Sequence, residues 1–92
     1  EALPMQLILR NIMEEYVILT LDEMLNFLDG CKCERCRLDI ASYTLNRLQP
    51  KYVATTQGEL MSRLCEFDSQ FKASIMKEIT IAHEVVNKHP RH

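Results

Sequence analysis

The sequence has few of the residues that interrupt helices or build sheets. It contains two glycines and three prolines among 92 residues, no tryptophan, and only three tyrosines and three phenylalanines. Because tight turns depend on glycine and proline, this scarcity argues against a many-stranded sheet and favours a few long helices. We therefore expect an all-α fold, formed by a single domain that spans residues 1–92.

The sequence also lacks the patterns of several functional classes. No apolar stretch approaches the roughly 20 residues that cross a bilayer, so no association with a membrane is expected. The chain has no glycine-rich phosphate loop and no His-Glu-x-x-His motif, and its three histidines lack a neighbouring serine or acidic constellation. We therefore expect that the protein is not an enzyme.

Charge is distributed unevenly along a chain whose net charge is -2. Residues 1–30 contain one arginine against six acids, whereas residues 31–52 contain five basic residues against two acids. Binding to a long nucleic-acid duplex requires a broad basic surface that releases many counterions. The short basic segment instead indicates a small anionic partner or an ordinary solvated surface, and DNA binding is the weakest alternative.

Apolar residues recur every three or four positions in three stretches, which is the spacing of a buried helical face. The first predicted helix runs from Met5 to Leu28, with Gly30 just past its end. The second runs from Arg35 to Leu48 and stops before Pro50. The β-branched residues around Thr20 leave a break in the first helix open.

The third predicted helix follows a helix-start signature. In a capping box, the hydroxyl of Thr56 accepts from the Glu59 backbone N–H while the Glu59 side chain bonds back to the Thr56 N–H. From there the apolar spacing continues to Asn87, so we expect one long C-terminal helix of about 45 Å. A monomer of this size cannot bury so long a stripe, which requires a break or a partner subunit.

We expect the partner to be a second copy in a symmetric homodimer, because two-fold dimers are the commonest closed assembly. The short segment Lys51–Thr55 alternates like an extended chain, and two copies of it could pair across such a dimer.

Three of the four cysteines are crowded into six residues, as Cys31, Cys33 and Cys36. Disulfide frameworks rarely crowd like this, whereas thiolates that converge on a metal do, which predicts structural Zn²⁺ and a reducing cytoplasm. Reduced thiols without a metal and an iron–sulfur cluster are the alternatives. Cys65 is the natural fourth ligand, or else a buried small apolar residue. Four thiolates would leave no open coordination position, so the site is structural.

Two segments carry a resemblance to a known family. Residues 31–41 form Cys-x-Cys-x-x-Cys-Arg-Leu-Asp-Ile-Ala, and residues 45–55 form Leu-Asn-Arg-Leu-x-Pro-Lys-Tyr-Val-x-Thr. Together they resemble the late competence development protein ComFB family of bacteria, and the similarity extends over nearly the whole chain. The resemblance implies a small helical, zinc-containing homodimer that is not an enzyme. It also implies a cyclic di-GMP receptor that acts through an unidentified protein effector in competence, motility or related regulation.

The basic segment contains side chains suited to such a ligand. Arginine binds phosphates and guanine edges bidentately, and tyrosine stacks on purines. We expect Arg47, Lys51 and Tyr52, around the end of the second helix, to contact the nucleotide, with Arg37 as the next candidate. Each is alternatively an ordinary surface charge or packed ring, and the alternative function is a zinc-structured protein–protein interaction module without a nucleotide ligand.

Overall fold

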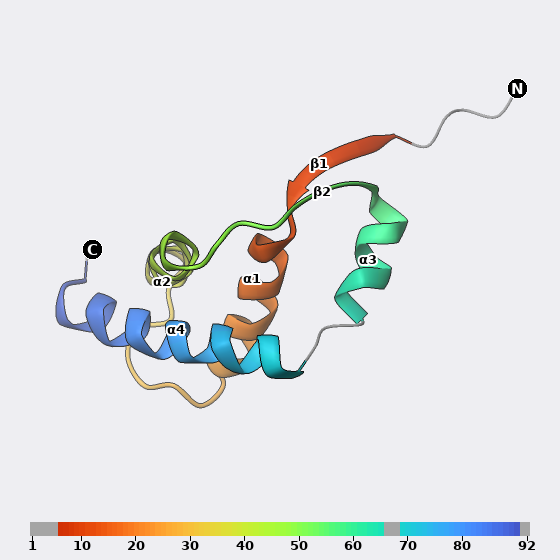
Figure 1. Ribbon diagram of the computed structural model, residues 1–92. Coiled ribbons are helices and arrows are strands. Elements are labelled where there is room, and N and C mark those ends of the chain that lie inside the picture. Colours follow the sequence, from red (N-terminus) through yellow and green to blue (C-terminus); the bar gives the residue numbers. More distant parts are fainter. Residues whose placement is uncertain (1–5, 66–68, 91–92) are drawn as a thin grey trace, which may run out of the picture.

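The computed structural model describes the backbone of residues 6–65 and 69–90 and the side chains of residues 6–62 and 71–90. The elements follow in the order β1 (Leu7–Asn11), α1 (Ile12–Met24), α2 (Glu34–Arg47), β2 (Tyr52–Thr56), α3 (Gln57–Cys65) and α4 (Ser69–Lys88). The fold is mostly helical, as expected (Figure 1). Within the described residues it has four helices rather than three main ones and adds a two-stranded sheet, so the all-α prediction needs correction.

The helices α1, α2 and α4 pack against one another and enclose the hydrophobic core. The fully buried side chains of this core include Ile12, Val17, Leu21, Cys36, Ile40, Ile75, Ile79 and Ala82. Within each helix they recur at steps of three to five residues, so one face of every helix points inward. None of the helices in the described part of the chain combines the length and hydrophobicity that a membrane span requires.

The first helix begins later than predicted. Residues 7–11 form strand β1, and α1 begins at Ile12, where the Asn11 side chain accepts a hydrogen bond from the Met13 N–H at 3.1 Å. The apolar residues at the start of the chain fit a helix or a strand equally well by local spacing. Their strand partner lies some 40 residues later, and this non-local pairing decides the outcome.

The strands β1 and β2 form an antiparallel ribbon in which Leu9 lies opposite Ala54 and Asn11 lies opposite Tyr52. The prediction of an extended segment after the second helix is thus confirmed, but in the described chain its partner is β1 rather than a second copy. Asn11 also joins the ribbon to the chain before β2, because its Oδ1 accepts from the Lys51 N–H at 2.8 Å.

The C-terminal stretch forms two helices rather than one. The predicted capping box is present: the Glu59 N–H donates to Thr56 Oγ1 at 3.2 Å, and the Thr56 N–H donates to Glu59 Oε1 at 3.0 Å. The helix that starts there ends at Cys65, and α4 starts at Ser69. The apolar face of α3 packs on β2 and α1, whereas that of α4 packs on α1 and α2. A single straight helix could not reach both surfaces, so the break replaces the expected long helix.

Candidate metal centre and adjoining cavity

The loop between α1 and α2 brings three cysteines together. The Sγ atoms of Cys31, Cys33 and Cys36 all lie within 4.8 Å of one another. A tetrahedral zinc ion with Zn–S bonds of about 2.3 Å holds its sulfurs about 3.8 Å apart, so a small inward movement closes the cluster around one ion. Cys36 is buried, whereas the other two thiols are exposed. The cluster therefore fits a thiolate-bound metal ion at the edge of the core.

The N-terminus of α2 supplies the electrostatic setting of this cluster. Cys33 is the N-cap residue, and its carbonyl accepts from the Arg37 N–H at 2.9 Å. The nearby backbone N–H of Cys36, together with the Cys31 thiol, lowers the pKa of Cys33. Burial raises the pKa of the Cys36 thiol to about 12. Of these two sulfurs, the exposed one at the helix N-terminus is therefore the easier to ionise, because negative charge is favoured there.

The predicted fourth ligand, Cys65, is the last residue of α3. Its side chain is outside the described residues. The helix α3 lies on the opposite side of α1 from α2 (Figure 1). Among the side chains that the structure describes, no further histidine, cysteine or carboxylate joins the three sulfurs. The assignment of Cys65 as a metal ligand stays a prediction.

Arg37, one of the predicted ligand residues, faces α1. Its Nε and Nη2 donate to the two carboxylate oxygens of Asp22 at 2.8 and 3.1 Å, and its Nη1 donates to Glu34 at 3.3 Å. The hydrogen bond with Arg37 lowers the pKa of Asp22. Ten residues of helix span about 15 Å, so α2 holds Arg37 well away from Arg47 at its other end.

The other three predicted residues lie where the chain leaves α2 and enters β2. Arg47 Nε donates to Glu78 on α4 at 2.7 Å, and its guanidinium carbon lies 5.9 Å from the ring centroid of Tyr43. Lys51 Nζ lies 5.5 Å from the ring centroid of Phe71. Tyr52 is 64% exposed. The two cations thus each lie over an aromatic ring, and the tyrosine is open to solvent on the ribbon.

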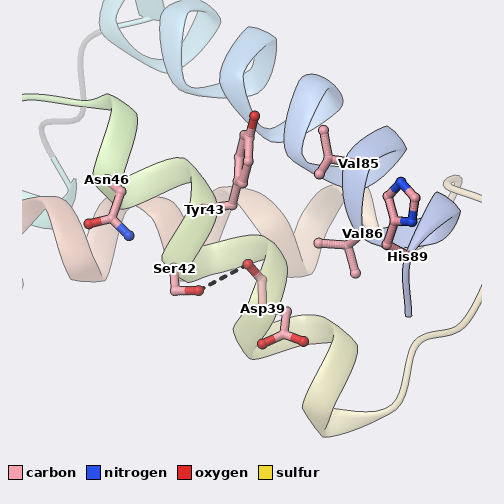
Figure 2. A pocket seen from close by; sticks show the side chains of 7 residues that line it. All are labelled: Asp39, Ser42, Tyr43, Asn46, Val85, Val86 and His89. Atoms are coloured by element: carbon pink, nitrogen blue, oxygen red, sulfur yellow. Dashed lines mark hydrogen bonds between the residues drawn. The ribbon is translucent and has the colours of Figure 1, made fainter. Parts of the chain in front are cut away.

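A cavity of about 230 Å³ opens between α2 and α4 (Figure 2). It is lined by Asp39, Ser42, Tyr43 and Asn46 of α2, by Val85 and Val86 of α4, and by His89, which directly follows α4. The four α2 residues follow the spacing of one helical face, which is visible in the sequence. The sequence reasoning missed the cavity because it did not indicate that α4 covers that face. None of the lining residues is a lysine or an arginine, but Arg47 directly follows Asn46 in α2 and lies over the Tyr43 ring.

The comparisons with known proteins agree with the sequence resemblance. The family model described as late competence development protein ComFB matches residues 10–90. A solved structure titled as the structural characterization of the late competence protein ComFB from Bacillus subtilis superposes with a TM-score of 0.77 and 26% sequence identity, covering 90% of this chain and 92% of that one. A search of curated protein sequences gives no significant match. On the strength of the family match and the shared fold, this chain belongs to the ComFB family.

Proposed function

We propose that this chain is a non-catalytic regulatory protein that binds cyclic di-GMP between α2 and α4 and signals through a protein effector. The observation that carries the proposal is the position of Arg47, which lies beside the cavity and is 49% exposed in its side chain. Its ion pair with Glu78 is open to solvent on the arginine side, and such surface pairs contribute little to stability. A bidentate bond to a phosphate is stronger, so Arg47 can exchange one partner for the other.

The cavity supports a guanine base as its occupant. Its volume of about 230 Å³ is below the roughly 300–1,000 Å³ of a drug-sized site, so it admits one base rather than the dinucleotide. Val85 and Val86 offer apolar contact to the flat faces of a base. The Asp39 carboxylate is an acceptor that suits the adjacent N–H donors of guanine and not the Watson–Crick edge of adenine. The phosphates would then lie outside the cavity, toward Arg47 and Lys51.

Calorimetry with the zinc-loaded protein tests this proposal. We expect saturable binding of cyclic di-GMP, much weaker binding of cyclic di-AMP, and a loss of at least tenfold in affinity for Arg47→Ala. The matched control is Lys77→Ala, which removes an exposed positive charge from α4. Equal affinities of the two variants would contradict the assignment of Arg47, and no detectable heat at about 1 mM ligand would contradict the receptor function.

We also propose that the three cysteines hold a structural zinc ion, with Cys65 as the fourth ligand. A divalent ion lets all the thiols ionise together, which removes the opposed preferences of Cys33 and Cys36. Because the site needs reduced thiols, we propose a cytoplasmic location. Elemental analysis should find one zinc per chain in the purified protein and none in Cys33→Ser. A folded, metal-free wild-type protein would contradict the site.

We further propose that the chain forms a homodimer, and the exposed apolar face of the β1–β2 ribbon supports this. Cross-strand pairing puts Leu7, Leu9 and Tyr52 on one face, where they are 68%, 74% and 64% exposed. The Cα radius of gyration is 15.0 Å, against about 12 Å for a compact domain of this length. An elongated chain with an apolar ribbon face suits a second copy or a protein effector.

Sedimentation analysis distinguishes whether a second copy of the chain or a protein effector covers the ribbon face. We expect a dimer that Leu9→Asp converts to a monomer, whereas Leu38→Asp, at a comparably apolar and 48% exposed position on α2, leaves it intact. A wild-type protein that stays monomeric at all concentrations would assign the ribbon face to the effector. If it also binds no nucleotide, the chain would be a zinc-structured protein–protein interaction module.

A further inference from the structure

The loop that carries the cysteines is attached to the C-terminal part of α4. His83 Nε2 lies 2.5 Å from the carbonyl oxygen of Asp29, and Asn87 Nδ2 lies 3.5 Å from the same oxygen. The two side chains are one helical turn apart and are 2.9 Å from each other. Since a carbonyl oxygen only accepts, His83 donates to Asp29 with the proton on Nε2; Asn87 Nδ2 is also a donor, so both side chains converge on the Asp29 oxygen rather than bonding each other. A backbone carbonyl two residues before Cys31 is thus bound by a helix more than 50 residues away.

The next residue of the loop, Gly30, lies close against the side chain of Asn87. Gly30 has φ 100°, a backbone conformation that favours glycine. A Cβ atom built there would lie only 2.7 Å from both Nδ2 and Oδ1 of Asn87. The amide of Asn87 therefore lies directly against the Gly30 backbone, and no other residue type fits without moving it.

These contacts fix the backbone just before Cys31, which is the one cysteine of the three-sulfur cluster that precedes the N-cap of α2. Cys33 and Cys36 belong to the N-cap and first turn of α2, so the helix fixes the spacing of their sulfurs. Cys31 is exposed and precedes the helix, and the residues just before it are those bound by α4. Resting on the proposed zinc site, we infer that His83 and Asn87 are positioning residues, which hold Cys31 in place for the metal and make metal affinity depend on α4.

This arrangement links the two parts of the proposed function. The turns of α4 that bind the cysteine loop also supply Val85 and Val86 to the cavity, and His89 follows directly after them. A metal ion held between the loop and α2 therefore restrains both helices that form the cavity walls. Without His83 and Asn87 the ion would restrain α2 alone.

Competition with a chromogenic chelator tests the inference in the full-length protein. Residues that orient metal ligands from outside typically change metal affinity about 10–100-fold. We expect a loss in that range for His83→Ala and Asn87→Ala, partial recovery in His83→Gln, and no change in the control Glu84→Ala, at an exposed position of α4 next to His83. Cobalt-substituted His83→Ala should show weakened thiolate-to-cobalt charge-transfer bands.

Thermal unfolding with and without zinc distinguishes positioning from general support of the fold. For a positioning role, His83→Ala lowers the melting temperature of the zinc-loaded protein more than that of the chelated protein. Equal losses in both states, with unchanged zinc affinity, would overturn the inference. Gly30→Ala provides a second variant, because it pushes the Asn87 amide away instead of removing it, and we expect the same loss of zinc affinity. If the purified wild-type protein contains no zinc, both the metal site and this inference are wrong. If the wild type binds zinc and the variants bind it equally well, only the inference is wrong.

Discussion

Apolar side chains are buried in the three-helix core of α1, α2 and α4, whereas several of them are exposed in the arm, which is formed by β1, β2 and α3. In the core, Ile40, Ile75 and Ile79 are fully buried between α1, α2 and α4. In the arm, which lies to the upper right of these helices in Figure 1, Leu9 is 74% exposed and Met61 is 54% exposed. The core is complete within one chain, whereas the arm presents apolar surface that a second molecule can cover.

The largest expected difference comes from shortening one apolar side chain in each region. Ile79→Ala removes buried volume from the core and should lower the free energy of unfolding by about 3 kcal/mol. Leu9→Ala acts on an exposed side chain and should change the free energy of unfolding of the monomer by less than about 0.5 kcal/mol. Urea unfolding at low protein concentration measures both.

The same pair of variants reports on association. If the arm forms the dimer interface, the effect of Leu9→Ala should grow with protein concentration while that of Ile79→Ala stays constant. A Leu9→Ala variant that loses as much stability as Ile79→Ala in the dilute monomer would show that the distinction between core and arm is wrong.

A smaller effect is expected at the start of α3, within the arm. Thr56→Ala removes the hydroxyl that accepts from the Glu59 N–H, and loss of such a cap costs about 1 kcal/mol. Hydrogen exchange should therefore speed up in α3 while the amides of α4 keep their protection. The control Ser42→Ala removes an exposed helix hydroxyl that bonds only a nearby carbonyl, at 3.1 Å from Asp39 O, and should leave α3 unchanged.

The sequence predicted the features that depend on neighbouring residues. The second helix was expected from Arg35 to Leu48 and occupies 34–47, because its apolar spacing and the following Pro50 are local signals. The capping box at Thr56 was found for the same reason. The cysteine cluster also follows from spacing alone, since three thiols within six residues at a helix start can hardly lie far apart.

The features that the sequence did not predict depend on distant contacts. The stretch at Leu7–Leu9 became a strand because β2 pairs with it, and the C-terminal helix broke because its two halves pack on different surfaces. The cavity joins Asp39 of α2 to residues near the C-terminal end of α4, and the contact of His83 joins α4 to Asp29 in the loop before α2. Periodicity identifies the faces of a helix but does not indicate which face meets which neighbour.

An ion pair at the core surface gives an effect that depends on pH. The hydrogen bond from Arg37 lowers the pKa of Asp22 below that of an ordinary aspartate, so the pair stabilises the fold above the ordinary pKa and loses its contribution as the pH falls through the lowered pKa. Asp22 is 47% exposed, so we expect Arg37→Ala to cost only about 0.5 kcal/mol at pH 7. Urea unfolding at pH 7 and at about pH 2 should show a difference from wild type that shrinks at the lower pH; an equal difference at both would assign it to lost packing.

The smallest effect is expected for Thr44→Val in the core, and the same substitution in the arm provides the comparison. In the core, the Thr44 hydroxyl is buried and finds no hydrogen-bond partner among the described residues. In the arm, the Thr55 hydroxyl, also in a buried residue, donates to Glu59 at 3.3 Å. Replacing a desolvated, unpaired hydroxyl by a methyl group is nearly neutral or stabilising, whereas removing a bonded one costs about 1 kcal/mol. Thr44→Val should therefore leave the urea midpoint unchanged or raise it slightly, and Thr55→Val should lower it. A clear loss of stability in Thr44→Val would indicate that its hydroxyl is bonded to a buried water, and that the core contains a polar contact which packing alone does not explain.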